Sequence, residues 1–132
     1  MKIEEHKELF EEHKETIFKW ALEVKGLKES QRTIGLHASR AMIDLLSIYL
    51  LKKGKISPGK QINHRWFKSN KAADKIPEFP NKKYIVKRIV ELELLCEKLT
   101  YGSKRPEGEI KNALELFNEI ESDITGLENE KK

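Results

Sequence analysis

The chain is poor in cysteine and has no long apolar run. Its single cysteine, Cys96, cannot form a disulfide within the chain, which is typical of proteins from reducing compartments. The longest mostly apolar run, 45–51, has about seven residues, whereas a membrane-spanning helix needs about 20. The charged N-terminus lacks the apolar core of a secretory signal. We therefore expect a soluble cytoplasmic protein without membrane contact.

The sequence also lacks the motifs of several enzyme classes. It contains no phosphate-binding glycine loop, no dinucleotide fingerprint and no zinc-ligand spacing. His6 and His13 lie about 10 Å apart along one predicted helix, too far to share one metal ion, because Zn–N distances are about 2 Å. We expect them to pack at interior positions. The sequence predicts no metal and no cofactor, and it favours a non-catalytic protein over an enzyme.

Strand patterns are absent as well, and helical periodicity takes their place. Four long helices are predicted at about residues 3–25, 30–53, 82–101 and 106–126. A chain of 132 residues suits one domain. The predicted fold is an all-α, antiparallel up-down bundle of four long helices, with a short basic helix between the second and third of them. The domain spans 1–126, and a charged, disordered tail follows at 127–132.

The first predicted helix carries a heptad repeat, which indicates a packed seam. Gly26 is expected to end this helix. The seam, or a face of the second helix, is also a candidate surface for a homodimer. Its two rows of residues are Ile3, Phe10, Ile17 and Val24, and then His6, His13, Trp20 and Leu27.

The second predicted helix is apolar around most of its circumference and has one narrow polar stripe. So wide an apolar arc predicts the central helix of the bundle. The stripe falls within about 80° when residues are placed 100° apart. It consists of Thr33, His37, Arg40, Asp44 and Ser47.

This stripe has a structural and a functional interpretation. In the structural one, Arg40 and Asp44 form an ion pair one turn apart and His37 packs beside them. In the functional one, Asp44 orients Arg40 on a phosphate while His37 transfers a proton. Arg32 and His37 also spell R-x4-H, but about 140° separates them on a continuous helix.

Charge is distributed unevenly along the chain. Residues 52–88 carry twelve Lys or Arg and two acids, whereas residues 107–132 carry three Lys and eight acids. The predicted short helix lies in the basic block and combines cations with aromatic rings, which suits contacts to phosphates and bases. We expect the exposure of Trp66 to distinguish a nucleic-acid-binding surface from a solvated basic surface, because a buried ring leaves only the positive charge to contact a ligand. The candidate anion-binding residues are Lys60, His64, Arg65, Trp66, Lys68, Lys71 and Lys75.

The stretch LHASRAMIDLLSIYLLKKGKI at 36–56, the basic histidine-containing segment after it and the two later helices resemble the HEPN superfamily of helical bundles and small archaeal helical proteins. The resemblance implies an up-down bundle, frequent homodimers and association with nucleotides or RNA. Catalytic HEPN members cut RNA without metal through an R-x4-6-H motif, usually in the later helices. Here no histidine follows His64, and Arg32–His37 lies early.

Three hypotheses follow. The leading one is a non-catalytic binding module, dimeric, whose basic patch contacts RNA or an acidic protein. The second is a HEPN-type, metal-independent endoribonuclease that uses His37 with Arg32 or Arg40 and with Asp44. The third is a purely structural subunit that binds another protein.

Overall fold

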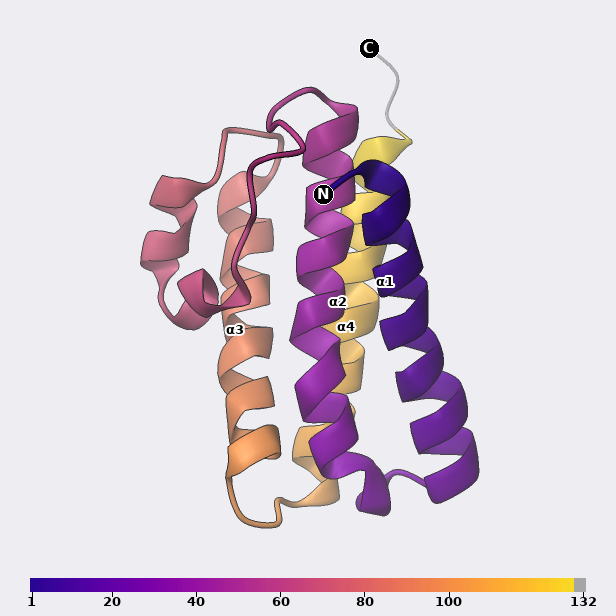
Figure 1. Ribbon diagram of the computed structural model, residues 1–132. Helices are drawn as coiled ribbons and strands as arrows, with labels where there is room; N and C mark the ends of the chain where they lie inside the picture. Colours follow the sequence, from indigo (N-terminus) through magenta and orange to yellow (C-terminus); the bar gives the residue numbers. More distant parts are fainter. Residues whose placement is uncertain (130–132) are drawn as a thin grey trace.

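The computed structural model describes residues 1–129, and within them the chain is all-helical, without a strand. The all-α bundle is therefore confirmed. Four long helical segments run alternately up and down (Figure 1). The elements are α1 (Ile3–Glu15), η1 (Thr16–Lys25), η2 (Lys28–Ser30), α2 (Gln31–Lys52), η3 (His64–Lys68), η4 (Asn70–Lys75), α3 (Lys82–Tyr101) and α4 (Glu107–Glu128).

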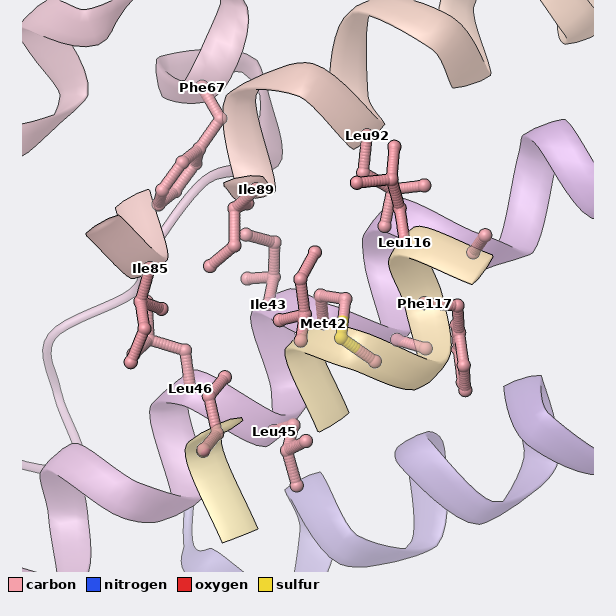
Figure 2. Close-up of a cluster of buried hydrophobic side chains, with 14 of the residues drawn as sticks. Met42, Ile43, Leu45, Leu46, Phe67, Ile85, Ile89, Leu92, Leu116 and Phe117 are labelled. Carbon is pink, nitrogen blue, oxygen red and sulfur yellow. The ribbon is translucent and has the colours of Figure 1, made fainter. Parts of the chain in front are cut away.

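Helix α2 is the centre of the bundle, as its wide apolar arc predicts. It packs against α1, α3 and α4, and Leu45, Ile48 and Tyr49 are all buried. Figure 2 shows Met42 and Leu46 of α2 within the apolar cluster that also contains Ile85, Ile89 and Phe117 of α3 and α4. The polar stripe is not left open by this packing, because Asp44 and Ser47 are buried as well.

Gly35 allows α2 and α3 to approach closely. A Cβ atom at this position would lie 2.6 Å from Thr100 Oγ1, 2.8 Å from Leu99 Cβ and 2.9 Å from the Cys96 carbonyl oxygen. Real Cβ atoms do not come so near, so a larger residue would push the helices apart. The glycine thus sets the spacing of the two helices that form the base of the candidate site.

The first helix changes its winding at Thr16, where the α-helix becomes the π-helix η1. The wider turn shifts the buried face, so Ile17 and Ala21 are buried while Trp20 and Val24 are 54% and 67% exposed. The predicted seam therefore holds only in its first half. Gly26 ends the helix as expected, with a φ of 91°.

The predicted single basic helix is wrong in detail. Residues 55–63 are not helical, and the helical part consists of two 3-10 segments, η3 and η4, separated at Ser69. Figure 1 shows the chain descending beside α2 after that helix ends, with η3 and η4 against α3. Phe67 and Ala72 anchor the two segments in the core.

The last helix is longer than predicted. It continues through Gly126 to Glu128, and Leu127 is buried, because an apolar residue at this position extends the core-facing stripe of α4. Residues 130–132 of the predicted tail lie outside the described residues. One stretch within 1–129, Lys28–Lys52, is long and apolar enough to cross a membrane, but 78% of its apolar window is buried inside the bundle, as in a core helix.

Candidate functional site

The polar stripe of α2 faces two histidines of α1, and together they form a linear polar network. His6 Nδ1 lies 2.8 Å from Asp44 Oδ1 in a buried contact. His13 Nδ1 lies 2.9 Å from His37 Nδ1, and His13 Nε2 lies 3.7 Å from Asp44 Oδ2. The four side chains are thus connected in the order His6–Asp44–His13–His37. Asp44 contacts its two neighbours through different oxygens, and His13 contacts its two neighbours through different nitrogens.

The protonation states of this network follow from its contacts. An ionised carboxylate only accepts hydrogen bonds, so His6 Nδ1 carries a proton when Asp44 is charged. Two Nδ1 atoms 2.9 Å apart cannot both be protonated, so either His13 or His37 accepts the hydrogen bond. At least one nitrogen of the imidazole pair is therefore unprotonated, and an unprotonated imidazole nitrogen can accept a proton or a hydrogen bond.

Burial dominates the electrostatics of this network. Burial, then the neighbouring His37 and Arg40, lower the pKa of His13 to about 4. Burial and then Arg40 also lower the pKa of His37. Burial raises the pKa of Asp44, and its hydrogen bond from His6 opposes that rise. At neutral pH the two facing imidazoles are thus uncharged, and Arg40 is the cation beside them.

One sequence-based pairing in this region is wrong, and a second pair of residues diverges as its spacing on a continuous helix predicts. The predicted Arg40–Asp44 ion pair does not form, because the carboxylate of Asp44 is turned toward His6 and His13. Arg40 instead donates to the Leu36 carbonyl oxygen one turn earlier. The structure does not bring Arg32 to His37 either, because Arg32 donates to the Thr100 carbonyl oxygen of α3 at 2.8 Å, whereas His37 faces α1.

Arg40 lies where two adjoining hollows meet. The larger, of about 440 Å³, is formed by α1, α2 and the segment 61–65, and its walls include His13, Arg40, Asp44 and Arg65. The smaller, of about 90 Å³, continues toward α3 and reaches Tyr101. Both are lined by Arg40, His64 and Arg65. We refer to the two together as the arginine groove.

The carboxylates of the arginine groove are already paired with basic side chains, whereas its two arginines have no acidic partner among the described residues. Glu93 is buried and lies 3.2 Å from His64 Nδ1. Glu97 accepts from Lys68 at 2.6 Å, and that contact raises the pKa of Lys68. Within residues 1–129, neither Arg40 nor Arg65 has a carboxylate partner. The groove therefore presents two planar guanidinium groups to a ligand.

The predicted anion-binding residues do not lie on one helix, because Lys60 precedes η3 and the others are divided between η3 and η4. Lys60, Arg65, Lys71 and Lys75 are exposed, but His64 and Lys68 are engaged by glutamates of α3. Trp66 is half-buried against the core, and Lys75 Nζ lies 5.2 Å from the centroid of its ring. Trp66 is therefore a packing residue with a covered face rather than a free platform for bases.

The roles of His6 and His13 were missed at the level of sequence, although a signal exists. The two histidines are seven residues apart on one helix, and His37 and Asp44 are seven residues apart on the next. Antiparallel pairing that places His13 beside His37 automatically places His6 beside Asp44. Equal spacings of polar residues on consecutive helices would have predicted the network.

The described residues contain no group of three His, Cys, Asp or Glu side chains arranged to hold a metal ion. The linear order explains why, since His13 directs its two nitrogens at different neighbours. Cys96 is buried, and burial raises the pKa of its thiol to about 12, which disfavours the reactive thiolate at neutral pH. Another surface hollow, of about 840 Å³, is lined only by α1 and η1, and five of its lining residues are glutamates, so it is one helix flank rather than a cleft.

Comparison with known proteins gives no relative, since no family model, curated protein or solved structure matches the chain.

Proposed function

We propose that this chain is a non-catalytic RNA-binding helical bundle that holds phosphates in the arginine groove. The observation that carries the proposal is the pair Arg40 and Arg65, which line one concavity without a carboxylate partner in the described part of the chain. Guanidinium groups match the oxygens of a phosphate in bidentate geometry. The carboxylates that line the groove already contact other side chains, so an anionic ligand would supply the negative charge that Arg40 and Arg65 lack.

The rest of the groove also suits an extended anion such as an RNA backbone. Gln61 and Asn63 contribute amides to the same wall, and exposed Lys60, Lys71 and Lys75 extend the positive charge beyond it. A polyanion that runs past the groove gains from every one of these cations, because each neutralised phosphate releases counterions. The HEPN resemblance of 36–56 supports the same class of ligand.

The test is the double variant Arg40→Gln, Arg65→Gln, compared with the double variant Lys83→Gln, Lys87→Gln. Both remove two positive charges, and Lys83 and Lys87 are exposed cations of α3 outside the groove. Fluorescence anisotropy with a labelled single-stranded RNA should show at least a tenfold loss for the arginine variant, from two charge-assisted contacts, and little change for the lysine variant.

Equal affinities of both variants would refute the proposal. Parent-protein binding that does not change between about 50 and 300 mM salt would do the same, because phosphate contacts lose affinity steeply with salt. Displacement of the RNA by polyglutamate at equal charge concentration would show instead that the groove accepts an acidic protein.

The His13–His37 contact favours a second candidate, a metal-independent ribonuclease. A neutral imidazole accepts the proton of a ribose 2′-hydroxyl, whose oxygen attacks phosphorus while the P–O bond to the 5′-oxygen breaks and that oxygen takes a proton from solvent water. Arg40 would stabilise the charge on the phosphate. This candidate predicts RNA cleavage to a 2′,3′-cyclic phosphate that persists in EDTA and is lost in His37→Ala. Undiminished cleavage by that variant would eliminate it.

A further inference from the structure

Tyr101 is the most exposed large apolar or aromatic side chain among residues 1–129, and the proposed phosphate contacts do not use it. It is the last residue of α3 and is 76% exposed. Tyr101 borders the smaller hollow of the arginine groove, whose other charged lining residues are Arg40, Arg65 and Lys68 and the already engaged Glu93 and Glu97. An exposed aromatic residue near two guanidinium groups that have no carboxylate partner within 1–129 is a combination that suits a nucleotide.

The dimensions of the groove exceed those of a single phosphate. One end of the smaller hollow is marked by Glu93 of α3, which contacts His64. Tyr101 lies eight residues after Glu93 on α3, which corresponds to about 12 Å along the helix at 1.5 Å per residue. Arg40 and Arg65 border both hollows, so they lie between the amide end at Gln61 and Asn63 and the ring of Tyr101. A chain of nucleotides can therefore place a phosphate on the arginines and an adjacent base at the tyrosine.

We infer that the arginine groove binds single-stranded RNA, with phosphates on Arg40 and Arg65 and a neighbouring base stacked on Tyr101. The inference rests on the proposed function and adds the strand form of the ligand and the residue that selects it. Stacking on an aromatic ring accepts every base, because each base has a π face. In a duplex the bases are stacked on one another and cannot reach the ring.

The other aromatic side chains of this region are less suitable. Trp66 is half-buried, and one face of its ring is covered by Lys75. Tyr84 lies at the opposite end of α3, outside the groove, where the Arg88 guanidinium is 5.1 Å from its ring centroid. Tyr84 is therefore a matched control, since it is an exposed tyrosine on the same helix that does not line the groove.

The experiment compares Tyr101→Ala, Tyr101→Phe and Tyr84→Ala with the parent chain. The probes are a labelled RNA strand of about 12 nucleotides, enough to cover one small binding domain, and the duplex of the same sequence. Tyr101→Ala should weaken binding of the single strand roughly tenfold, within the range that one stacked base contributes, and should leave duplex binding within about twofold. Tyr101→Phe, which keeps the ring, and Tyr84→Ala should bind like the parent.

A second readout reports stacking directly. The fluorescence of 2-aminopurine placed in the strand is quenched when the base stacks, so the parent should quench it and Tyr101→Ala should not. Thermal unfolding of each variant verifies the fold. If Tyr101→Ala binds the single strand as tightly as the parent, or if the parent prefers the duplex, this inference is wrong, although losses in Arg40→Gln, Arg65→Gln would still support the proposed function. If those arginine variants lose nothing, the proposed function itself fails.

Discussion

The residue that governs the pH response of the bundle is His13. Its folded-state pKa is about 4, below the ordinary 6.5, because burial disfavours the charged ring. Between these two pH values the His13 ring is protonated in the unfolded chain but not in the folded chain, so the free energy of unfolding falls as the pH falls. The lowered pKa of His37 acts in the same direction. The raised pKa of Asp44 acts oppositely, since its contribution to stability is lost as the pH rises above 3.8.

We expect urea unfolding to give a free energy of unfolding about 2 kcal/mol lower at pH 5 than at pH 7 from His13 alone, at 1.36 kcal/mol per pH unit below 6.5. The variant His13→Gln has no ring to titrate, so its difference between the two pH values should be less than half that of the parent. The same difference in both chains would mean that His13 titrates normally in the folded protein.

At the scale of the element, the contact between α2 and α3 depends on Gly35. Glycine within a helix normally costs about 1 kcal/mol relative to alanine, so Gly→Ala in an open helix stabilises. At Gly35 the added Cβ would meet Thr100 Oγ1 and the Cys96 carbonyl oxygen at 2.6 and 2.9 Å. Gly35→Ala should therefore destabilise the bundle by roughly 1–3 kcal/mol.

Gly126→Ala is the control for that substitution, because Gly126 lies within α4 and a Cβ there meets no atom within 4 Å. It should raise the free energy of unfolding by up to about 1 kcal/mol. Opposite signs of the two effects in thermal or urea unfolding would establish the close contact. Stabilisation by both variants would show that α2 and α3 are further apart.

The helices themselves were predictable from sequence, because apolar residues at a spacing of 3.6 determine both the element and its buried face. The burial of Leu45, Ile48 and Tyr49 follows from that pattern alone. The exposure of Trp20 does not, because a heptad count assumes one winding and η1 has another. The partner of Asp44 was missed for a different reason, since contacts between helices depend on their relative register, which single-helix periodicity leaves open.

The candidate site was predictable only as a list of residues. The polar stripe of α2 indicated His37, Arg40 and Asp44, and charge indicated the segment 52–88. What joined them was the path of 61–65, which carries Arg65 to the side of Arg40. That path depends on the anchoring of Phe67 in the core, and no local pattern in a proline- and glycine-bounded segment determines it.

At the scale of the whole molecule, the excess of positive charge lies in 52–88, with twelve Lys or Arg and two acids, whereas residues 1–25 carry five Lys and seven Glu. Figure 1 shows α1 and the segment that contains η3 and η4 on opposite flanks of α2. If the field of the basic flank draws RNA to the groove, the location of a lysine matters as well as its charge. Two triple variants separate these effects. The variant of the basic flank combines Lys60→Gln, Lys71→Gln and Lys75→Gln. The variant of the α1 flank combines Lys7→Gln, Lys19→Gln and Lys25→Gln.

Both triple variants remove three positive charges and so lower the formal net charge from +4 to +1. Each also removes one lysine that lies over a tryptophan ring, Lys75 over Trp66 or Lys19 over Trp20. The variant on the basic flank should bind single-stranded RNA more weakly, and its slope of log affinity against log salt should be shallower by about 2, at roughly 0.7 per lost phosphate contact. The variant on the α1 flank should keep the slope of the parent. Equal slopes in the two variants would mean that net charge alone attracts the ligand, and the basic flank would then have no directing role.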